Sequence, residues 1–138
     1  MKKTIFALVL LLVLGLTGCA GSSDNDDIIE IGERFFVNQM TEIFLNHSQY
    51  MGRTIRYEGM FRTARWGDME FSVVYRNVPG CCSPEEVMGF EVVMDGFELF
   101  EDNAWVEVTG VLDFDGSYII IRVTEIVELE ERGAEWVS

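Results

Sequence analysis

Apolar and polar side chains alternate with a period of two through most of the chain after its first third, and this pattern constrains the fold more than any other feature. Neighbouring side chains of a β-strand point to opposite faces, so such alternation is typical of strands with one buried and one exposed face. Five stretches show it, beginning near Ile55, Met69, Phe90, Trp105 and Tyr118. The sequence therefore predicts a mainly β fold with five successive strands.

Four of these strands indicate which of their faces is buried. The residues that we expect to point inward are Ile55, Tyr57, Gly59 and Phe61 in the first strand, Met69, Phe71, Val73 and Tyr75 in the second, Phe90, Val92 and Met94 in the third, and Val106, Val108, Gly110, Leu112 and Phe114 in the fourth. Asp115 and Gly116 are favoured in a type I′ turn. They predict a tight hairpin into the fifth strand, residues 118–128, which is rich in isoleucine and valine.

One helix is predicted ahead of the strands. Its apolar positions recur at the spacing of a single helical face, and they are Phe36, Met40, Ile43, Phe44 and His47. This pattern indicates an amphipathic helix of about thirteen residues.

Five short strands with only one helix must protect their edges, and closure into a small barrel does so. The glycines that suit the bulges and coiling of such a barrel are Gly59, Gly89 and Gly110. We therefore expect a five-stranded OB-like barrel with one leading helix over residues 33–130. A charged tail follows at 131–138, from which we expect Trp136 to pack back onto the domain. The alternative is an open sheet covered on one face by the helix.

The chain begins with the pattern of a secretion signal over residues 1–18. Lys2 and Lys3 give a positive start, and residues 4–16 form an almost unbroken apolar run of thirteen residues. Such a run is too short for a stable membrane-spanning helix, so we expect it to direct export.

Residues 16–19 read Leu-Thr-Gly-Cys and look like the lipobox of bacterial lipoproteins, in which the cysteine becomes the first residue after cleavage and is diacylated on sulfur. This resemblance implies that Cys19 carries lipid. The small, polar and acidic stretch that follows cannot order itself, so residues 19–32 are expected to be a lipidated cysteine and a flexible tether. Anchoring by two or three acyl chains is effectively permanent. A lipid-anchored protein on the extracytoplasmic side of the cell membrane is predicted; the alternative is a simple signal peptide with an incidental cysteine.

The charge of the chain excludes one class of partner. The formal net charge is −14, from 24 acidic and 10 basic side chains. Nucleic-acid binding draws most of its affinity from a basic face that neutralises phosphates, so we expect no nucleic-acid partner. Both lysines lie in the expected signal peptide, which leaves a mature chain without lysine.

Cys81 and Cys82 are the only cysteines after the expected lipid attachment site, and their chemistry has three interpretations. A disulfide between adjacent residues would be strained, because Cα atoms about 3.8 Å apart lie below the usual disulfide range. Metal binding needs both sulfur atoms on one side, which Pro79, Gly80 and Pro84 favour by replacing strand geometry with a turn. The third interpretation is a buried pair of small apolar side chains.

A metal ion at this pair would need one or two further ligands. Glu85, Glu86 and His47, the only histidine of the chain, are the residues that offer them. The predicted site consists of Cys81, Cys82, Glu85 and His47, and it suits zinc best, with copper(I) as the rival. On the apolar stripe of a helix, however, a histidine is more often a core residue with one satisfied nitrogen than a ligand.

Part of the chain resembles the carboxy-terminal domain of the YcgQ-like (DUF1980) family. The segments that carry the resemblance are residues 50–59, the pair of Cys81 and Cys82, and residues 105–110. The resemblance extends over about residues 35–130 and implies an OB-like fold, association with a YcgR-type membrane permease and a link with zinc homeostasis. The family pattern has an aspartate where this chain has Glu85, and its membrane-spanning amino-terminal part is replaced here by the expected lipid anchor.

These observations favour a non-catalytic function. The sequence has no nucleophile motif, no phosphate-binding glycine loop and no His-Glu-x-x-His helix. We expect a cell-envelope lipoprotein that acts as a binding module for a metal ion, a small ligand or a partner protein, linked to a membrane permease. The alternatives are a structural or protein-interaction domain of the envelope and a thiol redox protein.

Overall fold

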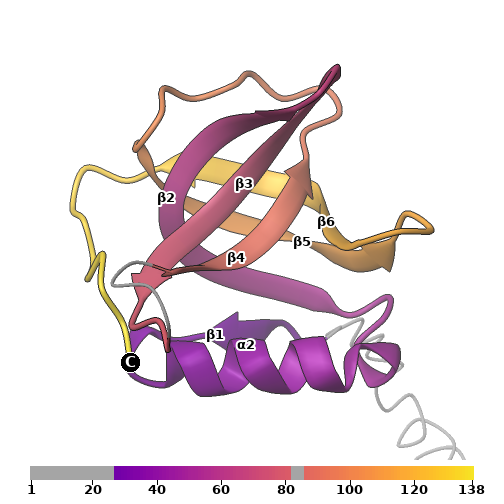
Figure 1. Cartoon of the computed structure of the whole chain (residues 1–138), viewed down its shortest axis with the longest axis vertical. Coiled ribbons are helices and arrows are strands. Elements are labelled where there is room, and N and C mark those ends of the chain that lie inside the picture. Colours follow the sequence, from indigo (N-terminus) through magenta and orange to yellow (C-terminus); the bar gives the residue numbers. More distant parts are fainter. Residues whose placement is uncertain (1–26, 82–85) are drawn as a thin grey trace, which may run out of the picture.

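Six strands and one α-helix make up the part of the chain that the structure, a computed structural model, describes: residues 27–81 and 86–138 (Figure 1). The elements are β1 (Ile29–Ile31), the 3-10 helix η1 (Glu33–Phe35), α2 (Phe36–Leu45), the 3-10 helix η2 (His47–Gln49), β2 (Thr54–Trp66), β3 (Met69–Val78), β4 (Glu86–Val93), β5 (Trp105–Phe114) and β6 (Ile119–Glu128). The predicted mainly β fold with one leading helix is confirmed.

The strands run in the order β1-β2-β3-β4-β6-β5, and β2 pairs with β5 as well, so the last five form a ring. Within the ring, β4 and β6 are parallel and pair over three residues only, whereas the other neighbours are antiparallel. This is the Greek-key arrangement of a five-stranded, partly open barrel. The fold is therefore OB-like, as the sequence predicted.

The sixth strand, β1, was not predicted. Residues 29–31 were assigned to the tether, but they pair in parallel with β2, beginning at Ile29 opposite Ile55. Ile31 is buried in the core. Three residues are too few to display a period of two, which is why the alternation that revealed the other strands could not reveal this one.

The long strand β2 holds the ring together by changing partner along its length. It pairs with β5 from Thr54 to Met60 and with β3 from Met60 to Trp66. Gly59 lies at this change of partner, where a Cβ atom would stand 2.7 Å from the carbonyl oxygen of Tyr75. Only glycine lets the two backbones approach so closely.

The core lies inside the ring and is closed at one end by α2 (Figure 1). Phe36, Met40 and Ile43 of the predicted apolar stripe are buried, and Phe44 packs against Phe90 with ring centroids 4.8 Å apart. The expected inward residues of β2, β4 and β5 are buried for the most part: Ile55, Tyr57, Phe61, Phe90, Val92, Val106, Val108 and Leu112. Phe114, however, is half exposed because it is the last residue of its strand.

The inward face predicted for β3 was wrong. Met69 is 66% exposed, and Val74, Arg76 and Val78 of the opposite face are buried instead. Two features of the sequence explain the error. The outward residue Tyr75 is also buried, in a second apolar cluster, and the inward position 76 holds a charged arginine where an apolar residue is expected.

The turn and the tail also differ from expectation. Asp115 donates its backbone N–H to the carbonyl oxygen of Tyr118, with Gly116 and Ser117 between them. Only Gly116 has a positive φ there, of 100°, whereas a type I′ turn requires two such residues, so that prediction was wrong. In the tail, Val137 is the residue that packs into the core, while Trp136 stays half exposed.

Candidate functional site

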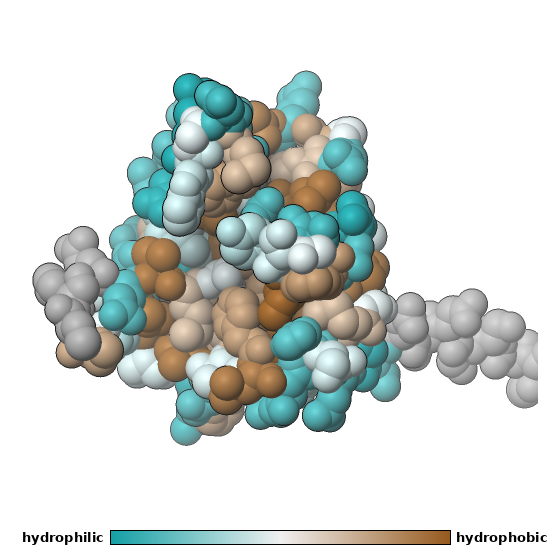
Figure 2. All heavy atoms as spheres, turned by 45° about the vertical axis from the view of Figure 1, so that its right-hand side comes forward, coloured by the Kyte–Doolittle hydropathy of each residue, from teal (hydrophilic) through white to brown (hydrophobic). Residues whose placement is uncertain are grey.

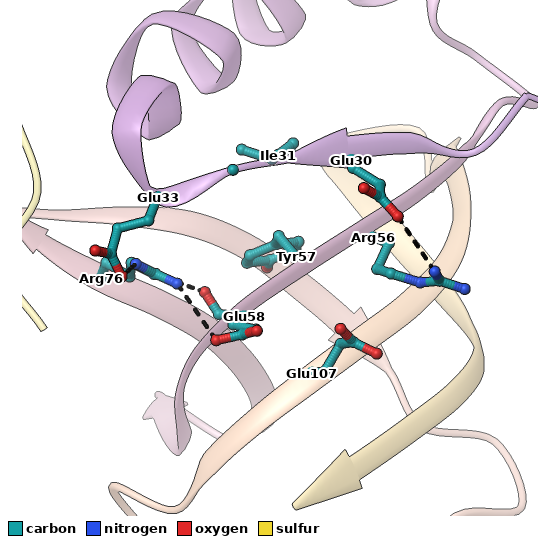
Figure 3. A pocket seen from close by; sticks show the side chains of 9 residues that line it. Glu30, Ile31, Glu33, Arg56, Tyr57, Glu58, Arg76 and Glu107 are labelled. Atoms are coloured by element: carbon teal, nitrogen blue, oxygen red, sulfur yellow. Dashed lines mark hydrogen bonds and ion pairs between the residues drawn. The ribbon is translucent and has the colours of Figure 1, made fainter. Parts of the chain in front are cut away.

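Three charged side chains and one tryptophan gather at the end of the ring where η1 and the tail meet β2 and β3, and we call them the Arg76 cluster. Its members are Arg76, Glu33, Glu58 and Trp105. Figure 3 shows Arg76 directed at Glu33 and Glu58 beside a small pocket of about 260 Å³. The neighbouring pair of Arg56 and Glu30 lines the same pocket, as does Glu107.

Arg76 is only 2% exposed, and its buried charge is compensated by hydrogen-bond and ion-pair partners. Its Nε donates to the backbone oxygen of Glu58 at 2.7 Å, and its Nη1 donates to Glu33 Oε2 and to the backbone oxygen of Ala134, each at 3.2 Å. The guanidinium also stacks over Trp105, 4.8 Å from the ring centroid. A buried arginine is tolerated when its donors are satisfied in this way.

The two carboxylates of the cluster also accept hydrogen bonds from groups other than Arg76. Glu33 Oε2 accepts the backbone N–H of Ala134 at 2.8 Å, and this bond, with help from Arg76, lowers the pKa of Glu33 below its usual value. Glu58 Oε2 accepts from Trp105 Nε1 at 3.1 Å. The cluster thus ties η1, β2, β3, β5 and the tail together, and each of its charged side chains has a partner within it.

A second hollow, larger and more apolar, lies where the β2–β3 hairpin tip approaches the β5–β6 turn. It has a volume of about 650 Å³, and its lining residues are Trp66, Met69, Glu70, Phe71, Glu91, Asp115 and Tyr118. A neighbouring hollow of about 270 Å³ shares Glu70, Phe71 and Glu91 and continues to Met94 and Leu99. We call the two together the β3–β4 groove. Figure 2 shows the side of the molecule on which the β5–β6 turn projects, with hydrophobic side chains gathered between hydrophilic ones.

The walls of the β3–β4 groove are large side chains that the fold leaves in solvent. Trp66 is 75% exposed and Tyr118 is 61% exposed, and both flank turns. Monomeric proteins rarely leave such side chains together without a partner, so a grouped set marks a binding surface. No sequence pattern predicted this groove; the available signal was the presence of aromatic residues next to turns.

Two carboxylates of the groove repel each other. Burial and the charge of Asp115 raise the pKa of Glu91. Asp115 itself accepts the backbone N–H groups of Tyr118 and Ser117, each at 2.8 Å, and these bonds lower its pKa. Within residues 27–81 and 86–138, Glu91 has no ion-pair partner.

The predicted metal ligands are only partly described by the structure. Cys82 and Glu85 lie outside the described residues, as does Cys19, the predicted lipid attachment site. Cys81 is exposed on a bend after β3. His47 is also exposed, in η2, with its Nδ1 3.3 Å from the backbone oxygen of Phe44, so the prediction that it lies on the buried stripe was wrong.

The structure does not bring these two residues together. In Figure 1, the end of α2 that leads into η2 and the end of β3 lie on opposite sides of the molecule. Among the described residues, no group of three histidine, cysteine or acidic side chains is arranged to hold a metal ion.

Comparison with known proteins places the chain in a family. Residues 17–137 match the family described as the DUF1980 C-terminal domain. The chain belongs to this family. The resemblance noted in the sequence is thereby confirmed for the DUF1980 domain, and the strand order described above shows the OB-like fold. No curated protein matches the chain.

One solved structure with a similar fold is the dimeric N-terminal domain of PriB from Thermoanaerobacter tencongensis. It shares 15% sequence identity with this DUF1980 domain and covers 56% of this chain and 97% of its own, with a TM-score of 0.34. No helix in the described part of the DUF1980 domain has the length and apolarity needed to cross a membrane.

Proposed function

We propose that this protein is a lipid-anchored, non-catalytic binding module of the cell envelope whose ligand lies in the β3–β4 groove. The single observation that carries the proposal is the hollow of about 650 Å³ with Trp66 and Tyr118 exposed in its walls. Ligand sites are commonly concave, with apolar walls and a few polar groups that fix orientation.

The position of the groove on the fold supports the same function. OB folds bind ligands on the face of their second and third strands, between the loop that joins strands one and two and the loop that joins strands four and five. In this ring those strands are β3 and β4, and the two loops are the β2–β3 tip and the β5–β6 turn. The β3–β4 groove lies between the same elements.

A binding function fits the polar groups better than catalysis does. The cluster around Arg76 uses its charges to hold the fold, since each partner of Arg76 is itself bonded. The groove offers carboxylates and aromatic rings but, among its lining residues, no histidine, cysteine or serine beside them except Ser72, which is buried. Such a lining recognises a ligand without activating a nucleophile.

Fluorescence titration tests the binding function. The full chain carrying Cys19→Ala and Trp136→Phe would leave Trp66 as the exposed tryptophan. We expect at least one of three probes, a short basic peptide, a neutral peptide or chitotetraose, to change its emission, and Tyr118→Ala to abolish the change. If none of the probes perturbs Trp66, the groove is not a ligand site and the proposal fails.

Lipid anchoring is tested separately from binding. We expect the wild-type chain to incorporate a palmitate analogue and to sediment with membranes, and Cys19→Ala to lose both properties because two or more acyl chains are needed for stable anchoring. Cys81→Ala is the matched control and should remain in the membrane fraction. A Cys19→Ala chain that still takes up the label would contradict the anchor.

Zinc at Cys81, Cys82 and Glu85, and through it a link to a permease, stays a prediction. Its support is the pair of adjacent cysteines in a segment that begins at the exposed bend after β3. Native mass spectrometry of the reduced protein is the test: retained zinc that is lost in Cys82→Ser supports it, and a metal-free protein with both thiols alkylated overturns it.

A further inference from the structure

We propose that the β3–β4 groove binds an extended segment of a partner polypeptide, in which a lysine or arginine side chain lies between apolar residues. This inference rests on the proposed function, because it names the ligand of the same groove.

The shape of the groove favours an extended chain over a compact ligand. Its two hollows, of about 650 and 270 Å³, meet at Glu70, Phe71 and Glu91. Apolar walls lie on both sides of this junction, with Trp66 and Tyr118 at one end and Met94 and Leu99 at the other. Every second side chain of an extended segment faces the same side, so residues i and i+4 can place apolar side chains in the two hollows while residue i+2 lies beside the carboxylates.

The charges at the junction select a cation for that middle position. Burial, and after it the charge of Asp115, raises the pKa of Glu91, and a cation beside the two carboxylates would offset both effects. The other charged groups nearby are already paired, Arg65 with Glu70 at 2.6 Å and Arg122 with Asp113 at 2.5 Å. Glu91, Asp115 and the two ion pairs together comprise four carboxylates and two guanidinium groups, so the surroundings of the groove have a net negative charge.

The aromatic side chains of the groove also favour a cation. The exposed rings of Trp66 and Tyr118 offer π faces to a cation, a contact that gains strength when water is excluded. The chain as a whole carries a net charge of −14, which attracts basic partners and repels acidic ones. Shape, local charge and aromatic lining thus point to one occupant.

Isothermal titration calorimetry with matched peptides tests the inference on the full chain carrying Cys19→Ala. The probe is acetyl-Leu-Gly-Lys-Gly-Leu-amide, in which the three large side chains share one side of the extended chain, compared with peptides that have norleucine or glutamate in place of lysine. We expect the norleucine peptide to bind about tenfold more weakly, since a desolvated cation–π contact has this order of strength. The glutamate peptide should not bind, and added salt should weaken the lysine peptide.

Variants locate the cation. Glu91→Gln should weaken the lysine peptide by about tenfold and leave the norleucine peptide near its original affinity, because it removes a charged partner of the cation. Tyr118→Ala removes both a wall of the hollow and a π face, so it should weaken both peptides, and the lysine peptide more. Glu107→Gln and Trp136→Ala are matched controls outside the groove, and both should bind as the parent does. A thermal melt of each variant confirms that it is folded.

The outcomes separate this inference from the proposed function. Equal affinity for the lysine and norleucine peptides, or binding of chitotetraose alone, would overturn the cation but leave the groove as a ligand site. Butylammonium that binds as tightly as the peptide would assign a free amine in place of a polypeptide. Absence of all binding would overturn both proposals together.

Discussion

The Arg76 cluster and the β3–β4 groove both combine glutamate and aromatic side chains, but they use them in opposite ways. In the cluster, Arg76 is 2% exposed and every charged neighbour has a partner. In the groove, Glu91 has no ion-pair partner among the described residues, and Trp66 stands in solvent. Composition alone therefore does not distinguish the two regions, whereas unpaired charge and exposed rings do.

The largest effect is expected from Arg76→Met, which keeps the bulk of the side chain and removes its charge. Glu33, Glu58 and the backbone oxygen of Ala134 would lose their donor. We expect unfolding to become easier by about 3 kcal/mol, because breaking a buried ion pair leaves groups unpaired. Urea unfolding of the full chain with Cys19→Ala, followed by circular dichroism, measures this change.

Arg65→Met is the matched control for that experiment. Its pair with Glu70 is exposed, so its loss should change the free energy of unfolding by less than about 1 kcal/mol. Equal losses for the two variants would show that the cluster is no more structural than a surface ion pair.

The next largest effect on the free energy of unfolding is expected from a substitution in the tail. Val137 is buried in the core, and its backbone N–H donates to the oxygen of Asn77 at 3.0 Å. We expect Val137→Ala to cost about 2 kcal/mol from lost burial and the cavity left behind. Trp136→Ala, at the half-exposed neighbour, should cost clearly less in the same urea assay. The reverse order would mean that Trp136 is the residue that docks the tail.

Sequence patterns predicted the ring better than they predicted either polar region. Alternation in β2, β4 and β5 identified their inward residues because those strands bury one face each. Arg76 was missed for a physical reason: a charge can occupy an inward position only when partners from distant segments, here Glu33 and Ala134, are already in place. No local pattern records such partners.

The groove was missed for a similar reason. Trp66 and Tyr118 are far apart in the sequence and meet only because the β2–β3 tip folds toward the β5–β6 turn. The metal prediction relied on adjacency of Cys81 and Cys82, which sequence does show, and on His47, which the fold leaves exposed at the end of α2. Neighbours in sequence are therefore easier to recognise than neighbours in space.

The contributions of Glu33, in the Arg76 cluster, and of Glu91, in the β3–β4 groove, to the stability of the fold should change with pH in opposite directions. The pKa of Glu33 is lowered, mainly by the N–H of Ala134, so its stabilising effect is present above the ordinary value of 4.5 and is lost as the pH falls through its folded-state pKa. The pKa of Glu91 is raised, mainly by burial. Its contribution to the stability of the fold is therefore fully present below pH 4.5, the ordinary pKa of the side chain, and is lost as the pH rises through the folded-state pKa.

Glutamine variants test these signs. At pH 7, Glu33→Gln should lower the melting temperature and Glu91→Gln should raise it. Near pH 3 the Glu91→Gln difference should vanish, because both side chains are then neutral. Thermal melts across this range measure both effects, and two variants that shift in the same direction at pH 7 would contradict the contrast between the regions.

The smallest effect on stability is expected from Trp66→Ala, although it removes the largest side chain of the groove. Trp66 is 75% exposed, so its loss should change the free energy of unfolding by less than about 1 kcal/mol. Trp105→Ala is the matched change: that ring is 2% exposed, donates to Glu58 and lies under Arg76, so its removal should destabilise the fold far more than Trp66→Ala does. A tryptophan that contacts a ligand is expected to contribute little to folding and to be needed for peptide binding. A large loss of stability in Trp66→Ala would instead show that the β2–β3 tip is part of the core.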